Sequence, residues 1–168
     1  MKRIVLDSVD STNTYAEKNA NSLTENTLII AKDQTNGHGQ HNRKWFSEPG
    51  KSITLSFFLR DLPREKIQQM PSIISTSLNE LYAINSEVVL PNDIYVNDKK
   101  ICGLLIETYL KSNTIDYAII GIGLNLNNDA FPEYLSDKAS SVKIITGKTE
   151  NSDLFIEEIE KRMEALYA

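Results

Sequence analysis

The sequence predicts an α/β fold, a sheet covered by helices, and three of its features support this class. Two apolar runs rich in β-branched and aromatic residues, Thr27 to Lys32 and Ser52 to Leu59, have the composition of neighbouring strands near the middle of a sheet. From Arg64 to Ala83 apolar residues recur every three or four positions, as on a helix with one buried face. The same spacing from Ser152 to Tyr167 predicts a further helix.

Two shorter elements are predicted before these. Ile4 to Leu6 is a strand candidate, and a helix is expected over Tyr15 to Ala20 because several good capping residues precede it. Pro71 interrupts the helical pattern between Arg64 and Ala83. A proline there is tolerated at a kink or at a new helix start, so one of the two is expected.

The second half of the chain is predicted to form four strands, at Val88 to Leu90, Ile94 to Val96, Ile101 to Leu110 and Thr114 to Gly121. Asn97 and Asp98 have the residue types of a tight turn, which makes a hairpin of the strands around them. With an unbroken period of two, Lys100 and Cys102 would share one strand face and Gly103 would lie on the other.

Length and charge exclude several classes of protein. The 168 residues fit one domain. A formal net charge of −5 argues against a surface that binds nucleic acid, which would have to be basic. No apolar run reaches the roughly 20 residues of a membrane span, and the N-terminus lacks the apolar segment of a secretory signal. We therefore expect a cytoplasmic protein that binds neither nucleic acid nor membrane.

The residue types and motifs present in the sequence exclude several kinds of chemistry. Cys102 is the only cysteine, and His38 and His41 are the only histidines, so neither a disulfide nor a Cys/His zinc site is expected. The sequence has no nucleophile-elbow serine and no phosphate-binding P-loop motif. Hydrolase chemistry and P-loop nucleotide binding are therefore not supported.

The polar stretch from Asp33 to Gly50 is the strongest candidate for a ligand-binding loop. Gly37 and Gly39 permit close backbone approach to a ligand, and polar side chains such as that of Arg43 can surround an anion. Trp45, the only tryptophan, follows as an aromatic anchor. A long hairpin connection with a packed tryptophan explains this stretch equally well when it is taken alone.

Three other polar patches accompany this loop: Ser11-Thr12-Asn13, Pro91-Asn92-Asp93 with Lys100-x-x-Gly-x-Leu-x-Glu107, and Gly121-Ile122-Gly123-Leu124-Asn125. The first patch is explained more simply by helix capping than by ligand contact, because Ser, Thr and Asn satisfy free N–H groups at helix starts. The order and spacing of all the patches together carry more information than any one of them.

Taken together, these patches resemble the catalytic domain of the biotin protein ligases, which carry an S-T-N near the start, a G-x-G-x-x-[GN]-R-x-W loop, a P-N-D, a K-x-x-G-x-L-x-E and a later G-x-G-x-N. The resemblance covers nearly the whole chain. It implies a mixed, largely antiparallel sheet backed by helices, an α+β arrangement related to lipoate ligases and class II aminoacyl-tRNA synthetases. It also implies one catalytic domain over residues 1–168, without the N-terminal DNA-binding domain or the C-terminal β domain of some relatives.

The implied reaction joins biotin and ATP to biotinyl-5'-AMP and then transfers biotin to a lysine of a biotin carboxyl carrier protein domain. ATP, biotin and Mg²⁺ are the expected small molecules, and a homodimer is left open. A transferring phosphoryl group needs cationic and backbone donors, which makes Lys100 the catalytic candidate with Arg43 beside it. The biotin-binding residues are expected to be Ser11, Thr12, Asn13, Gln34, Gly37, His38, Gly39, Gln40, Lys100 and Gly103, and the nucleotide-binding residues Trp45, Asn92, Asp93 and Asn125.

The sequence departs from the family pattern at Gln40, where relatives often have arginine, and at Val89 and Leu90, where they have lysine and tryptophan. The loss of two positive charges suggests weaker phosphate binding. Two other functions stay open, and only the second of them is motivated by these departures. One is a lipoate or octanoyl protein ligase, which would need a longer apolar tunnel. The other is a module that binds biotin or an adenylate with little turnover.

Overall fold

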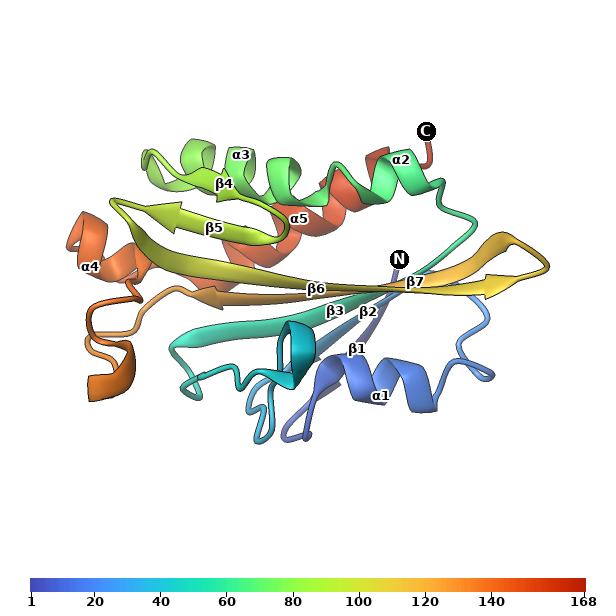
Figure 1. Ribbon diagram of the computed structural model, residues 1–168, viewed down its shortest axis with the longest axis horizontal. Coiled ribbons are helices and arrows are strands. Elements are labelled where there is room, and N and C mark those ends of the chain that lie inside the picture. Colours follow the sequence, from blue (N-terminus) through green and yellow to red (C-terminus); the bar gives the residue numbers. More distant parts are fainter.

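The computed structural model describes residues 1–168 and confirms the α/β class, with one mixed, mostly antiparallel sheet and helices on both of its faces (Figure 1). The seven strands lie in the order β1-β2-β3-β7-β6-β5-β4. Only β1 and β2 pair in parallel. The strands are β1 (Lys2–Leu6), β2 (Thr27–Ala31), β3 (Ser52–Arg60), β4 (Glu87–Val89), β5 (Asp93–Val96), β6 (Lys99–Lys111) and β7 (Thr114–Asn125).

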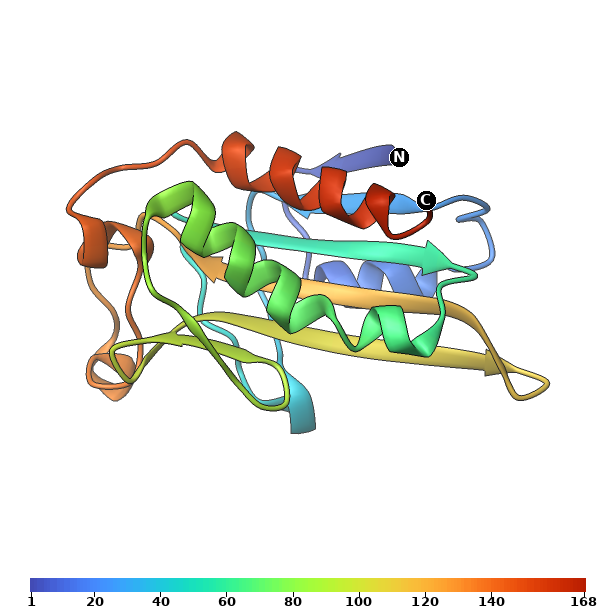
Figure 2. The same cartoon turned by 90° about the horizontal axis from the view of Figure 1, so that it is seen from above.

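The helices divide unequally between the two faces of the sheet. Figures 1 and 2 show α3 (Met70–Tyr82) and α5 (Ser152–Ala165) side by side over one face, with the short α2 (Arg64–Ile67) beside them. α1 (Thr12–Lys18) covers part of the opposite face. Helices therefore cover most of one face, and the other face leaves room beside α1.

The main core lies between the sheet and the pair α3 and α5. It contains 26 buried residues, among them Phe57 on β3, Leu78 on α3 and Phe155 on α5, each with no exposed surface. A smaller cluster of six buried residues, including Ala16 and Ile29, holds α1 against the sheet. The apolar spacing in the sequence thus identified the buried faces of the long helices correctly.

Pro71 marks a new helix start. α2 ends at Ile67 and α3 begins at Met70, which places Pro71 in the first turn of α3, where its missing N–H would have no intrahelical partner. α1 begins earlier than expected, at Thr12, because the Ser11 hydroxyl caps it by accepting a hydrogen bond from the Thr14 N–H at 3.4 Å.

The prediction of an unbroken period of two along β6 is wrong. Ile94 of β5 pairs with Cys102 of β6, but the next residue, Tyr95, pairs with Lys100, so Ile101 is an extra residue in a β-bulge. Ile101 and Cys102 are both fully buried, although they are consecutive. The bulge turns the chain by one residue, and Lys100 therefore lies on the same face as Gly103.

After β7 the chain forms a loop with a 3-10 turn over Glu133–Leu135 and the short α4 (Val142–Thr146) before it reaches α5. Residues 138–140 of this loop run alongside the start of β6, where Ala139 forms an isolated parallel bridge with Lys100. None of the helices has the length and apolar character needed to cross a membrane.

Candidate functional site

A pocket of about 200 Å³ lies on the face of the sheet that carries α1. Its walls come from the start of α1, the loop between β2 and β3, the turn before β5, the first half of β6 and the last part of β7. It brings together most of the side chains that the sequence motifs singled out. The predicted site residues that line it are Ser11, Thr12, Asn13, Gln34, His38, Gly39, Gln40, Arg43, Trp45, Asn92, Asp93, Lys100 and Gly103.

Two of the predicted residues do not line the pocket. Gly37 lies behind Gln34, and a side chain on Gly37 would meet the Gln34 Nε2 atom at 2.4 Å. Asn125 is only 3% exposed, and its Nδ2 donates a hydrogen bond to the backbone carbonyl of Ser140 at 3.1 Å. Gly37 therefore makes room for a pocket residue, and Asn125 holds a neighbouring loop.

One end of the pocket is tied to the start of α1. The Oε1 atom of Gln34 accepts a hydrogen bond from the Thr12 N–H at 3.0 Å and lies 3.3 Å from the Thr12 hydroxyl. The Thr12 side chain also lies 2.6 Å from the buried Ser56 hydroxyl on β3. Because these groups hold one another, the donors and acceptors at this end are fixed before any ligand arrives.

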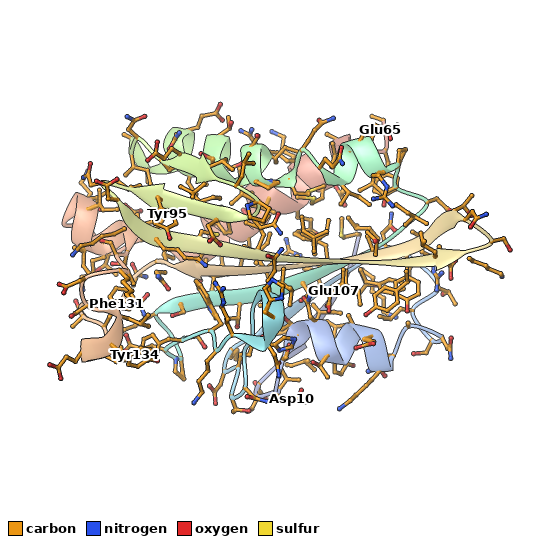
Figure 3. The ribbon with its side chains drawn as sticks, viewed as in Figure 1. Asp10, Glu65, Tyr95, Glu107, Phe131 and Tyr134 are labelled. Carbon is orange, nitrogen blue, oxygen red and sulfur yellow. The ribbon has the colours of Figure 1, made fainter.

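Asn13 occupies the centre of this polar network. Its Nδ2 donates to Glu107 Oε2 at 2.8 Å, and its Oδ1 lies 2.6 Å from the Ser56 hydroxyl. Figure 3 shows Glu107 between the middle of the sheet and α1. Gly121 is needed beneath Asn13, since a Cβ there would lie 2.4 Å from Asn13 Oδ1. Glu107, the buried Ser56 and the space left by Gly121 thus together fix the orientation of the Asn13 side-chain amide.

The other end of the pocket carries the charged groups. Lys100 Nζ lies 2.8 Å from Asp93 Oδ1, with about a third of each side chain exposed, so the pair is in contact with solvent. Lys100 Nζ also lies 5.4 Å from the centre of the Trp45 ring, within the range of a cation–π contact. Arg43 and Lys44 also line the pocket, are exposed and form none of the salt bridges of the structure. This end therefore suits an anion.

Trp45 lies flat against the sheet. A Cβ on Gly123 would come within 2.4 Å of the indole, so the ring can approach β7 this closely only because this residue is glycine. A Cβ on Gly103 would lie 3.1 Å from the ring, which is a tight contact. The indole Nε1 is buried and has no hydrogen-bond partner. Trp45 thus forms part of the pocket floor next to Lys100.

Asp93 is the one carboxylate that lines the pocket. No group of three or more His, Cys, Asp or Glu side chains is arranged to hold a metal ion. Mg²⁺ is commonly held in proteins by one or two carboxylates together with substrate phosphates, and Asp93 fits that pattern.

Cys102 is not a nucleophile in this site. Burial raises the pKa of the Cys102 thiol to about 12, so the thiol stays protonated at neutral pH. Because the thiolate is the reactive form, Cys102 acts as a small core residue.

Sequence patterns missed Leu55 and Ser56. Lys44 lies in the predicted loop, and Glu107, Gly121 and Gly123 belong to the quoted motifs, but none of these four was among the predicted site residues. Ser56 had a signal that went unused, because it is a polar residue within the apolar run of β3. Gly121 and Gly123 belong to a quoted motif, but only the structure shows that Asn13 packs against Gly121 and Trp45 against Gly123.

A comparison with known protein families matches residues 5–125 to the biotin/lipoate A/B protein ligase family. The chain is 35% identical over 153 residues to the bifunctional ligase/repressor BirA of Bacillus spizizenii. This match covers 86% of this chain and 47% of that protein. It is 32% identical over 133 residues to the BirA of Escherichia coli, with 73% and 40% covered. The chain thus spans about half the length, or less, of these curated relatives.

The fold comparison agrees. The biotin protein ligase of Aquifex aeolicus in complex with biotin and ATP superposes with a TM-score of 0.84 at 30% identity, covering 98% of this chain and 69% of that one. The fold and the order of the motifs are those of a ligase-type domain. The chain belongs to the biotin/lipoate A/B protein ligase family.

Proposed function

We propose that this protein is a biotin protein ligase. In the first step a biotin carboxylate oxygen attacks the α-phosphorus of ATP, giving biotinyl-5'-AMP and pyrophosphate. In the second step a lysine amine of a biotin carrier domain attacks the acyl carbon, and AMP leaves. The single observation that carries the proposal is that motifs far apart in the sequence line one pocket, with a fixed polar network at one end and Lys100 at the other.

The charged end suits the first step. Negative charge builds up on the phosphoryl oxygens as the new bond forms, and fixed cations at that position lower the barrier. Lys100 is the proposed catalytic residue, and Arg43 is the second cation, with Lys44 exposed beside it. Asp93 holds the Lys100 ammonium in place until the phosphates arrive.

The fixed polar end suits the head group of biotin. A ureido ring needs both donors and acceptors at set positions, and the network of Thr12, Asn13, Gln34 and Ser56 contains both. Ser11, His38, Gly39, Gln40 and Gly103 line the same pocket, and Gly37 contributes by leaving space for Gln34. Biotin would lie between this network and Lys100, with its carboxylate toward Lys100.

ATP would meet Trp45, Asn92 and Asp93 on the charged side of the pocket. Mg²⁺, held by the phosphates and Asp93, would neutralise part of the triphosphate charge. We propose the cytoplasm as the place of action, because ATP is supplied there.

Lipoate or octanoate activation is the second candidate. A long acyl chain would need an apolar tunnel, whereas most residues that line this pocket are polar or glycine. The polar lining therefore favours biotin over a long aliphatic chain.

Release of pyrophosphate from ATP and Mg²⁺, measured with biotin, lipoate and octanoate in turn, tests the proposal. We expect release with biotin only, and biotin attached to a lysine once a purified carrier domain is added. Release with lipoate or octanoate alone would favour the second candidate. Biotin binding by calorimetry without any release would instead identify a binding module.

A further inference from the structure

Ser56 is a polar residue at a position where packing alone would favour an apolar one. It lies in the middle of β3, among the mostly apolar residues 53–59, and has no exposed surface. It does not line the pocket. A buried hydroxyl without a partner would destabilise the fold, so the hydrogen bonds of Ser56 must account for its presence.

The hydrogen bonds of the Ser56 side chain lead to the first two residues of α1. Its hydroxyl oxygen lies 2.6 Å from Asn13 Oδ1 and 2.6 Å from Thr12 Oγ1. Both distances are at the short end of the range for hydrogen bonds between oxygen atoms. Because Thr12 and Asn13 line the pocket, Ser56 lies directly behind two side chains that a ligand would meet.

The direction of these hydrogen bonds follows from which groups can donate. Asn13 Nδ2 lies 3.3 Å from the carbonyl oxygen of Leu105, which can only accept, so the amide oxygen of Asn13 faces Ser56. An amide oxygen can only accept as well, and the one hydrogen of the Ser56 hydroxyl must therefore go to Asn13. The bond to Thr12 then requires the Thr12 hydroxyl to donate to the Ser56 oxygen.

One hydroxyl group thus fixes two side chains of the pocket. Ser56 supplies the only hydrogen bond that the Asn13 Oδ1 atom accepts. It also holds the hydrogen of the Thr12 hydroxyl, which could otherwise turn to Gln34 Oε1, at the longer distance of 3.3 Å. Loss of the Ser56 hydroxyl would therefore loosen both side chains and leave the other pocket residues in place.

We propose that Ser56 is a positioning residue for the head group of the ligand, which acts by holding the Thr12 hydroxyl and the Asn13 amide in one orientation before the ligand binds. This rests on the proposed function, because it concerns the end of the pocket assigned to the ureido ring of biotin. None of the hydrogen bonds of this network reaches Lys100, so the effect should fall on biotin and not on ATP.

The chain offers a matched control in another layer of the fold. Ser77 on α3 also has no exposed surface, and its hydroxyl donates to the carbonyl of Ile73 in the same helix at 2.8 Å. Ser77 does not line the pocket. Ser77→Ala thus removes one buried hydroxyl of the same kind without touching Thr12 or Asn13.

The first measurement follows the side-chain amide of Asn13 by nuclear magnetic resonance in the protein without ligands. In Ser56→Ala we expect the two amide hydrogens to exchange with solvent several-fold faster, because the amide oxygen is no longer held. Ser77→Ala should leave this rate unchanged. If the Ser56→Ala protein does not fold, Ser56→Cys, whose thiol is only a weak donor, replaces it.

The second measurement combines calorimetry of biotin binding with steady-state pyrophosphate release. We expect Ser56→Ala to raise the Kd and the KM for biotin by about three- to tenfold, the range for the loss of one hydrogen bond, while the KM for ATP stays the same. Ser77→Ala should change none of these values.

An unchanged exchange rate of the Asn13 amide in the Ser56 variant would overturn the proposal, and so would equal rises in the KM for biotin and the KM for ATP. A wild-type protein that binds no biotin would refute the proposed function. The exchange rates, which need no ligand, would even then show whether Ser56 holds Asn13.

Discussion

Lys100 is the residue on which the proposed chemistry depends most. We predict that Lys100→Met lowers the rate of pyrophosphate release by about 10²- to 10³-fold, as expected for the removal of one charged contact to a transferring group. Asp93 would then lack its ion-pair partner, but about a third of its side chain is in contact with solvent, so the fold should remain. Steady-state release, with circular dichroism as a check of folding, measures both effects.

Lys99→Met is the control for this change. Lys99 is the neighbouring residue, but its Nζ reaches the carbonyl of Ser136, outside the pocket, at 3.3 Å. Lys99→Met should keep nearly full activity. Near-normal release by Lys100→Met would remove Lys100 from the catalytic role.

The two departures from the family pattern, at Gln40 and at Val89, lie in different places relative to the pocket. Gln40 lines the pocket, whereas Val89 is 39% exposed and does not line it. We predict that Gln40→Arg lowers the KM for ATP by about five- to tenfold or more, the effect of one charge-assisted hydrogen bond. Val89→Lys should change it little, and biotin affinity without ATP should stay the same in both variants.

Steady-state kinetics at varied ATP concentration measures the KM for ATP in both variants and tests this prediction. An unchanged KM in Gln40→Arg would mean that Arg43 and Lys44 already supply the charge. A lower KM in Val89→Lys would mean that the turn before β5 moves toward the phosphates, contrary to the arrangement seen here.

Some residues of the site could be predicted from the sequence and others could not. Lys100 and Asp93 were predictable, because their motifs have a distinctive order and spacing. Ser56 was not predicted, because a polar residue within an apolar strand is a signal without a motif, and its role becomes clear only from its contacts with Thr12 and Asn13 at the start of α1. Asn125 was placed in the site by its motif, but its contacts lie behind the pocket.

At the scale of elements, the loop between β2 and β3 is the part expected to move. The pocket volume of about 200 Å³ is below the range of about 300–1,000 Å³ that is usual for ligand sites. We predict that residues 36–45 shift to admit biotin and ATP and then close over the adenylate. Cleavage by trypsin after Arg43 and Lys44, both exposed, should slow when biotin, ATP and Mg²⁺ are added.

The turn between β6 and β7 serves as an internal control. Lys111 is exposed and lies outside the pocket, so cleavage after it should not depend on ligand. Equal protection at Lys111 and at the loop would point to a general stabilisation of the protein. Equal cleavage of the loop with and without ligands would contradict the closure.

Periodicity predicted elements well where the chain is regular. It found the long helices and the break at Pro71, because apolar spacing and the missing proline N–H both act locally. It failed at the bulge in β6, because the extra residue depends on the register with β5, which is a property of two strands rather than of one.

At the scale of the whole molecule, the layer formed by α3 and α5 should govern stability. Phe155 has no exposed surface and belongs to the main core. We predict that Phe155→Ala lowers the free energy of unfolding by about 3–5 kcal/mol, the usual cost of such a cavity. Urea denaturation measures this value.

Leu154→Ala is the control, because Leu154 is the adjacent residue on α5 and is 49% exposed. It should change the free energy of unfolding by much less. A similar loss in both variants would mean that α5 does not pack against the sheet as the structure has it.

The order of the strands in the sheet could not be predicted from sequence patterns. β1 joins the sheet in parallel with β2 and at its edge, and β7 lies between β3 and β6. Such an order depends on which apolar faces meet, and alternation within one strand carries no information about its neighbours.

Successive residues of β7 face opposite sides of the sheet, so substitutions along this strand should have two different kinds of effect. Ala118 and Ile120 point into the layer of α3 and α5, whereas Gly121 lies under Asn13 and Gly123 under Trp45. A mutational scan of this strand would therefore split into two interleaved classes. Changes at the first set would appear as lower melting temperatures, and changes at the second as altered turnover in a protein that still melts cooperatively.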